Sequence, residues 1–361
     1  MFQPHVDSAS LTDVIEALER GRLEIEALDI RPVVERALHR TIEARGAHLS
    51  TRIEGNPMTE EQVRLALARS PGSNDPAEFE NRDYREATRL ASQVADDATA
   101  DIDGGLLRGL HYSVLRRTDR AGTRGQYRTT ANVIRRGSTV LYEPPPAHLV
   151  PSLMDDLVAW LRSARSVVHP LVLAAAAHAE LVNVHPFDDG NGRTARALTS
   201  YFAYRGGWRL RGLVTTEQVF GEDVQAYYDQ LRRFGERYPG QRPDLTPWTR
   251  WFLDALLSAV AARYSFVAHF DDLMRESIAR GLEGRLIDGA AVIWAAGSIS
   301  RSEYAAELGV SPATAAHDLS LLAAHGAVRR VGRGRSTRYE TVGPSVGEVL
   351  AGASLDARSP A

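Results

Sequence analysis

The sequence predicts a mainly α-helical protein. Apolar residues recur at three- and four-residue spacing along most of the chain, stretches rich in β-forming residues are few and short, and breaks rich in proline and glycine separate the helical segments. The chain has 361 residues, of which 43% are hydrophobic and 25% are charged. This length and composition are typical of a soluble globular protein with two or three domains.

The composition excludes several classes of site. The chain has no cysteine, which excludes disulfides, thiolate nucleophiles and Cys-ligated metal centres. It also has no lysine, which excludes Walker-type phosphate loops and Schiff-base chemistry. The net charge is only −3, so contact with nucleic acid would need a local basic patch. No apolar run approaches the roughly 20 residues that span a membrane, and no leader segment is evident. We therefore expect a cytoplasmic protein without a membrane partner.

The first part of the chain is predicted to be helical from Leu11 to about Arg69, with a break at residues 55–57. Thr59 and Gln62 have the spacing of a capping box, which predicts that a new helix starts after this break. A loop rich in Pro, Gly, Ser and Asn follows at residues 70–76. Helical periodicity then resumes from Glu78 to Ala95.

A small β-hairpin is predicted next, because Gln126–Ile134 and Thr139–Tyr142 contain β-forming residues and a turn sequence separates them. Three prolines at residues 144–146 end the second strand. The pattern then returns to helical periodicity in five segments, which are Leu149–Ala164, Leu171–Val184, Thr194–Arg205, Gly221–Phe234 and Thr246–Tyr264.

The strongest functional signal is the segment 185–196, which reads HPFDDGNGRTAR. An apolar helix ends at Val184, a short loop follows, and a new helix starts near Arg193. Glycines at such a junction leave backbone N–H groups facing one point, and the N-terminus of the helix adds partial positive charge there. The segment therefore predicts a nest for an anion such as phosphate.

The polar side chains of this segment fit phosphate chemistry. His185 can accept a proton at neutral pH, and a carboxylate such as Asp189 beside a phosphate site is a natural ligand for Mg²⁺. Arg193 and Arg196 lie three residues apart on one face of the first helical turn, where they oppose the helix dipole unless an anion compensates them. Together these groups predict a site for phosphoryl or nucleotidyl transfer.

The segment matches the pattern H-x-F-x-[D/E]-G-N-G-R-x-x-R at every defined position, and on this motif the chain resembles the Fic family of protein adenylyltransferases. The similarity covers roughly residues 50–264, in which Gly125–Arg128 and the hairpin resemble the lead-in and flap of that family. The resemblance implies a Fic-type helical core with a small β-hairpin flap. It also implies transfer of AMP from ATP to a Ser, Thr or Tyr hydroxyl of a target protein, or of the chain itself.

The resemblance also implies roles for single residues. His185 is the expected catalytic base, and Asp189 is the expected ligand of Mg²⁺ or Mn²⁺. Phe187 is expected to anchor the loop in the core. The residues implied in nucleotide binding are Gly190, Asn191, Gly192, Arg193 and Arg196, of which the arginines bind the β- and γ-phosphates. Tyr227 and Tyr228 either line the adenine pocket or pack in the core, and His178 is expected to be a buried core histidine.

A second motif lies before this core. Residues 50–55 read STRIEG and match the family's inhibitory pattern [S/T]-x-x-x-E-[G/N], as in the class whose inhibitory helix is N-terminal. Ser50 and Glu54 fall on one helix face, and Gly55 supplies the freedom that ends the helix. A Glu54 carboxylate that reaches Arg196 would occupy the group needed for the γ-phosphate. The competing interpretation is a solvated glutamate followed by a C-cap glycine.

The C-terminal segment predicts a helix at Arg301–Leu308, a turn, a helix at Pro312–His325 and a hairpin at Val328–Tyr339. This order resembles the winged helix-turn-helix family, with residues 332–335 as the wing tip. Its expected core residues are Leu308, Val310, Leu319 and Leu322. The residues that could contact DNA are Thr314 and His317 on the second helix and Arg333 and Arg335 in the wing. DNA binding and a protein-docking or architectural role are both left open.

We therefore divide the chain into an N-terminal helical region with the inhibitory helix (1–95), a Fic catalytic core (96–265), a linker helix with the winged helix-turn-helix (266–342) and a flexible tail (343–361). The expected function is an autoinhibited protein adenylyltransferase. Two alternatives are a DNA-binding transcriptional regulator whose core senses nucleotide with low turnover, and a Fic-type enzyme that removes AMP. The target protein, a homodimer and the signal that releases the inhibition are left open.

Overall fold

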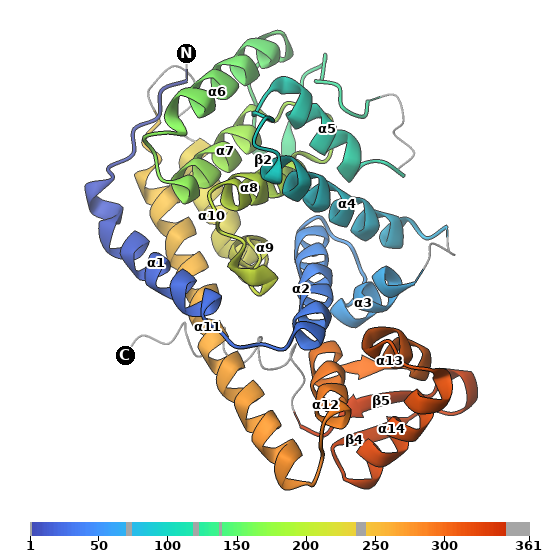
Figure 1. Cartoon of the computed structure of the whole chain (residues 1–361). Helices are drawn as coiled ribbons and strands as arrows, with labels where there is room; N and C mark the ends of the chain where they lie inside the picture. Colours follow the sequence, from blue (N-terminus) through green and yellow to red (C-terminus); the bar gives the residue numbers. More distant parts are fainter. Residues whose placement is uncertain (1, 70–73, 118–122, 137–138, 236–242, 344–361) are drawn as a thin grey trace. The chain divides into compact units, whose positions relative to one another are not determined.

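The computed structural model describes residues 2–69, 74–117, 123–136, 139–235 and 243–343. These residues form two compact units whose segments alternate along the chain (Figure 1). The first unit contains residues 1–20, 44–209 and 215–257, and the second contains residues 21–43, 210–214 and 258–361. The division of domains expected from the sequence stays a prediction. Of the predicted tail, only Gly343 lies among the described residues.

The N-terminal part is helical, as predicted. Its elements are η1 (Ala9–Leu11), α1 (Thr12–Glu26), α2 (Pro32–Ile53), α3 (Glu60–Ala68), α4 (Pro76–Asp96) and α5 (Gly104–Val114). The predicted capping box is present, because Thr59 accepts from the Gln62 N–H and the Gln62 side chain accepts from the Thr59 N–H. Helix α5 was not predicted. Three glycines within it weaken the helical signal, and Asp103 caps its N-terminus.

The centre of the first unit follows as β1 (Ile134–Arg136), β2 (Thr139–Tyr142), η2 (Ala147–Leu149), α6 (Val150–Ala164), α7 (Pro170–Val184) and α8 (Asn191–Arg205). Helix α8 packs against α7 and α4, and both α7 and α8 are buried along most of their length. The prediction of a first strand at residues 126–134 was wrong in extent. Strand β1 covers only residues 134–136, because the backbone and side chain of Arg128 bind the loop after α7 instead of a partner strand.

The remaining elements before the C-terminal module are η3 (Leu210–Gly212), α9 (Glu217–Gly221), α10 (Val224–Gly235) and α11 (Thr246–Ala279). The helix predicted over residues 221–234 corresponds to α10, which begins three residues later, whereas the short helix α9 was not predicted. Helix α11 extends beyond the predicted Tyr264. In the described ranges, no helix is both long enough and apolar enough to cross a membrane.

The second unit contains the winged helix-turn-helix, which is formed by α12 (Arg285–Ala296), β3 (Ser298–Ile299), α13 (Arg301–Leu308), α14 (Pro312–Ala324), β4 (Val328–Val331), η4 (Gly334–Ser336) and β5 (Arg338–Thr341). Its strands form an antiparallel sheet of order β3-β5-β4. Leu319 and Leu322 are buried as predicted, but Leu308 and Val310 are only partly buried. Tyr304 fills the core beside Gly289 of α12 instead, where a Cβ would overlap the Tyr304 hydroxyl.

Candidate active site at the start of helix α8

His185 ends helix α7 in the left-handed conformation, with φ 49° and ψ 58°. Its Nδ1 lies 3.2 Å from the Val182 carbonyl oxygen. Because a carbonyl can only accept, Nδ1 must carry the proton and Nε2 must carry the lone pair. Burial lowers the pKa of His185 to about 4, so the ring is neutral at pH 7. A general base needs an uncharged imidazole with a lone pair on its reacting nitrogen, and His185 has this state at Nε2.

The loop after His185 rests on a stacked pair of rings. Phe187 is fully buried, as predicted, and its ring centroid lies 3.7 Å from that of His111, with the two planes 3° apart. His111 Nδ1 accepts from the Gly125 N–H at 2.8 Å, and Nε2 donates to the Asp189 carbonyl at 3.0 Å. Sequence reasoning did not assign His111 to the site. No local pattern marks it, because its partners lie on other segments of the chain.

Asn191 closes the loop. Its side-chain oxygen accepts from the Phe187 N–H at 2.9 Å, and its amide group donates to the Phe187 carbonyl at 2.8 Å. The Asn191 side chain is therefore buried inside the loop, which leaves the Asn191 backbone to face an anion in the predicted nest. Gly190 precedes it with φ 74°, which turns the chain into α8. The first backbone N–H groups of α8 have no partners within the helix and are oriented toward its N-terminal end.

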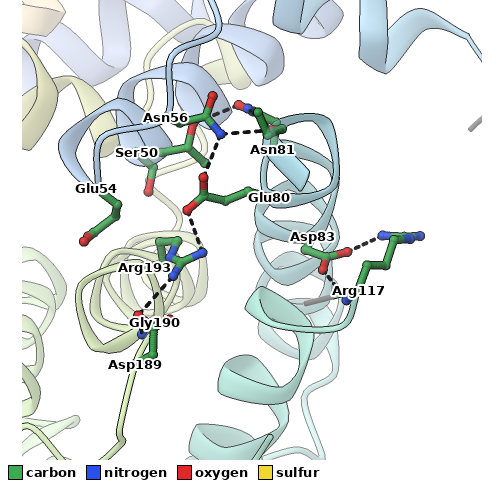
Figure 2. A network of polar contacts seen from close by, with 12 residues as sticks. Ser50, Glu54, Asn56, Glu80, Asn81, Asp83, Arg117, Asp189, Gly190 and Arg193 are labelled. Atoms are coloured by element: carbon green, nitrogen blue, oxygen red, sulfur yellow. Dashed lines mark hydrogen bonds and ion pairs between the residues drawn. The ribbon is translucent and has the colours of Figure 1, made fainter. Parts of the chain in front are cut away.

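Arg193 is buried between two carboxylates (Figure 2). One of its nitrogens lies 2.7 Å from Glu80, and another lies 3.4 Å from Asp189, whose carboxylate also accepts from the Gly190 N–H. Glu80 in turn accepts from the Asn56 side chain at 2.6 Å. Asn56 follows the inhibitory motif directly, so this network links Arg193 to the end of α2.

Arg196 is completely buried and contacts the inhibitory motif. Its Nε donates to the Ser50 hydroxyl at 2.7 Å, and Nη2 donates to the Ser50 carbonyl at 3.0 Å and to Glu54 Oε1 at 2.7 Å. Burial acts to lower the pKa of Arg196, but the Glu54 carboxylate raises it above its ordinary value. Among the described residues, Nη1 of Arg196 has no hydrogen-bond partner, although it is buried. A buried guanidinium with an unsatisfied nitrogen favours a further anion.

Two glycines allow Glu54 to reach this position. A Cβ added to Gly192 would lie 2.5 Å from Glu54 Oε1, so the carboxylate occupies the space that a side chain would fill at the N-terminus of α8. Gly55 has φ 91° and lets the chain leave α2 immediately after Glu54. The structure thus brings Ser50 and Glu54 to Arg196, with Glu54 at the predicted nest.

The two tyrosines on α10 differ in their surroundings. Tyr227 is buried among aromatic rings, and its hydroxyl lies 3.0 Å from Nε2 of His178. His178 is fully buried, and its Nδ1 lies 3.0 Å from the Thr199 hydroxyl, so the prediction of a core histidine is confirmed. Tyr227 is likewise a core residue. Tyr228 is 40% exposed and its hydroxyl lies 3.4 Å from the Ile53 carbonyl, which leaves it accessible beside the end of α2.

Arg128 fastens the hairpin to the loop. Its guanidinium donates to the carbonyls of His185 at 2.8 Å and Pro145 at 2.5 Å, and its backbone N–H donates to Pro186 at 2.8 Å. The Tyr142 hydroxyl of β2 also donates to the Asn183 side chain at 2.6 Å. These contacts place the exit of the hairpin beside His185.

The C-terminal residues predicted to contact DNA have different surroundings. Thr314 is partly buried, and its hydroxyl lies 2.9 Å from that of Ser311, the N-cap of α14. His317 and Arg333 are exposed. The side chain of Arg335 lies outside the described part of the structure. Arg329 of β4 pairs with Glu340 at 3.0 Å.

Comparisons with known proteins agree with this architecture. Residues 101–203 match the model of the Fic/DOC family, and residues 286–342 match the model of the C-terminal domain of DIP2311-like transcriptional regulators. The chain is 31% identical over 209 residues to the protein adenylyltransferase Fic of Drosophila sechellia, which covers 54% of this chain and 41% of that protein. It is 34% identical over 112 residues to the corresponding Aedes aegypti protein, with 31% and 20% covered. The chain therefore spans less than half the length of these relatives.

Solved structures share the fold. A Fic family protein from Desulfovibrio desulfuricans G20 superposes with a TM-score of 0.58 and 23% identity, over 95% of this chain and 99% of the other. Fic-1 from C. elegans gives a TM-score of 0.52 and 23% identity, over 70% of this chain and 71% of the other. The mainly helical fold, the loop geometry and the two model matches agree: residues 101–203 are similar to the Fic/DOC family, and the winged helix-turn-helix that follows is similar to the C-terminal domain of a transcriptional regulator.

Proposed function

We propose that the chain is a protein adenylyltransferase, which transfers AMP from ATP to a hydroxyl group of a protein. The observation that carries this proposal is the buried Arg196 beside the N-terminus of α8, where a carboxylate already occupies an anion position. A neutral His185 follows α7 at the other end of the same loop. The names of the relatives, which are protein adenylyltransferases, support the same reaction.

In the proposed reaction, the target hydroxyl attacks the α-phosphorus of ATP. His185 Nε2 takes the proton of that hydroxyl as the new P–O bond forms, and the bond between the α-phosphorus and its bridging oxygen breaks. Pyrophosphate leaves, and AMP remains on the protein. Arg196, Arg193 and the backbone N–H groups of Gly192 and Asn191 would bind the phosphates and stabilise the developing negative charge.

The donor set fits a magnesium ion that arrives with the nucleotide. Among the described residues, no group of three or more His, Asp or Glu side chains could hold a metal alone. Asp189 supplies one carboxylate, and its side chain is 41% exposed beside the nest. Mg²⁺ is commonly bound by one or two carboxylates together with substrate phosphates. Asp189 would hold the ion, which would neutralise phosphate charge when bound.

We also propose that Glu54 inhibits this reaction. Its carboxylate and the γ-phosphate would compete for the same guanidinium, because Arg196 already donates to Glu54 and Ser50. Glu54 would compete with the γ-phosphate by its charge as well as by its position, because its carboxylate reduces the positive potential that would attract ATP.

The test of the transfer reaction uses ATP labelled either at the α-phosphate or at the γ-phosphate, with Mg²⁺ and cell lysate. Protein labelled from the α-position only supports AMP transfer. Label from the γ-position would instead indicate phosphorylation. The His185→Ala variant serves as the control, since its label should disappear.

We propose DNA as a partner of the C-terminal module. The match to a transcriptional regulator supports this, as do the exposed Arg330 and Arg333 at the wing and the exposed His317 on α14. Such arginines would contact phosphates, and each neutralised phosphate releases nearly one counterion. A fluorescence-anisotropy titration with random duplexes should give a log–log salt slope that falls by about one when Arg333 is replaced by alanine. The absence of binding even at about 50 mM salt would reject DNA in favour of a protein partner.

A further inference from the structure

Helix α2 takes part in both compact units. Residues 44–53 belong to the first unit, and Ser50 lies in this half. Residues 32–43 belong to the second unit, which also contains the winged helix-turn-helix. The inhibitory carboxylate of Glu54 follows the last residue of the helix. The contacts of Thr41 and Arg40 lie within the second unit and that of Glu54 lies within the first, so α2 itself connects the two.

Thr41 joins the N-terminal half of α2 to α12. Its side chain is buried, and Oγ1 donates to the Ala295 carbonyl at 2.7 Å. Ala295 lies in the last turn of α12, where carbonyl oxygens have no partner within their own helix. Thr41 therefore satisfies a group that would otherwise be buried without a hydrogen bond.

Two ion pairs lie on the same half of α2 and just before it. Arg40 pairs with Glu307 of α13, and Arg31 pairs with Asp288 of α12 at 2.8 Å. The carboxylates of Asp288 and Glu307 are 15% and 18% exposed, whereas the two arginines are each 50% exposed, so water screens these pairs in part. The N-terminal half of α2 thus contacts both α12 and α13.

Within the winged helix-turn-helix, α12 and α13 are in turn connected to α14. Arg285, at the start of α12, donates to the buried carboxylate of Asp318 on α14 at 2.8 and 3.0 Å. The Tyr304 hydroxyl of α13 lies 3.5 Å from the same carboxylate. A change in the position of α14 would therefore alter the contacts of α12 and α13, which are the helices that contact α2.

We propose that the C-terminal module controls the inhibitory contact through α2, so that an event on α14 alters the access of nucleotide to Arg196. An α-helix is stiff, and about 20 Å of helix separates Thr41 from Glu54. A shift or rotation of the N-terminal half of α2 changes where Glu54 lies relative to Arg196. This inference rests on the proposed function, because it concerns regulation of the same site.

The test removes the Thr41 hydroxyl with little change in shape, as Thr41→Val, and restores it as Thr41→Ser. Self-modification, measured by intact mass after incubation with ATP and Mg²⁺, should rise about fivefold in Thr41→Val, which is the lower end of the usual coupling between sites. Thr41→Ser should remain at the wild-type level. Arg40→Gln should also raise the rate, whereas the matched exposed position Arg36→Gln should not.

A double-variant comparison shows whether the effect passes through the inhibitory contact. In a Glu54→Gly background, Thr41→Val should cause no further increase in self-modification, because the inhibitory carboxylate is already absent. An unchanged rate in both Thr41→Val and Arg40→Gln, or an equal increase with and without Glu54, overturns the proposal.

Hydrogen exchange distinguishes this failure from failure of the proposed function. The amides of Glu54, Gly55 and Asn56 donate to the last turn of α2, so they report its order. Their exchange should be several-fold faster in Thr41→Val than in Thr41→Ser. If Glu54→Gly gives no AMP adduct, the transfer reaction is wrong, and the exchange rates alone decide the coupling. Unchanged exchange then overturns it.

Discussion

Replacing Glu54 by glycine should raise self-modification of the chain. The change removes the carboxylate 2.7 Å from Arg196 and leaves the guanidinium with its two bonds to Ser50. A hydrogen bond to a charged group contributes about 1.5–3 kcal/mol net. Glu54 is 32% exposed, which weakens its attraction for Arg196 through screening by water. We therefore expect an increase on the order of 5- to 150-fold, which corresponds to about 1–3 kcal/mol.

The matched control is Glu54→Gln, which keeps the length of the side chain but removes its charge. Its amide oxygen can still accept from Arg196, so its rate should lie between those of wild type and Glu54→Gly. The assay follows the AMP adduct by intact mass over time, at an ATP concentration below saturation. Thermal unfolding of each variant provides the check that it is folded.

The same substitution has a second consequence, for stability. Without Glu54, the buried Arg196 charge loses its carboxylate partner, so the variant should unfold at a lower temperature than wild type when nucleotide is absent. ATP with Mg²⁺ should restore part of this loss, because a ligand that binds only the folded state stabilises it. Equal adduct levels in a folded Glu54→Gly variant and in wild type would refute the inhibitory role.

The remaining predictions concern the base and the buried histidines. His185→Ala should abolish transfer while leaving nucleotide affinity nearly unchanged, whereas Arg196→Ala should weaken nucleotide affinity as well. Measurements of turnover and a fluorescent-nucleotide titration separate the two effects. Substantial turnover in His185→Ala would reject His185 as the base. Burial keeps the pKa of His111 and His185 at about 4, and that of His178 well below its usual value, so the folded chain keeps these rings neutral. In the unfolded chain, histidine has a pKa near 6.5 and binds a proton below that pH. The contribution of these groups to the free energy of unfolding should therefore be constant above about pH 7. As the pH is lowered from 6.5 to 4, the free energy of unfolding should fall by about 1.4 kcal/mol per pH unit for each ring. Urea unfolding at pH 7.5, 6 and 5 measures this, and equal free energies of unfolding at pH 7.5 and 5 would contradict it.

The sequence predicted the loop at residues 185–196 because its chemistry is carried by consecutive residues. The same holds for the inhibitory motif, whose Ser50 and Glu54 lie one helical turn apart. Long helices with regular apolar spacing, such as α6 and α7, were also predicted within a residue or two of their ends. In each case a local pattern contains all the information that is needed.

The residues that support the site could not be predicted in this way. His111 comes from α5 and Glu80 from α4, and each contacts a residue far along the sequence. Arg128 lies in the segment 125–128 that the resemblance singled out, but its hydrogen bond to the His185 carbonyl was not predicted. Asn191 shows the same limit from within the motif. Its position was predicted, but its role in closing the loop depends on how the Phe187 backbone folds back toward α8. Tertiary hydrogen bonds of this kind leave no periodic signal.

The geometry around Arg196 explains why inhibition and nucleotide binding would use the same group. Arginine stays charged in proteins, so a fully buried guanidinium needs an anion at all times. When no nucleotide is bound, Glu54 supplies that anion. A carboxylate fixed within α8 could not withdraw to admit a phosphate, whereas Glu54 lies just after α2, beside the left-handed Gly55, and can move with the end of that helix. On this argument, the contact between Glu54 and Arg196 stabilises the empty site, and its position at the end of a helix would make the proposed inhibition reversible.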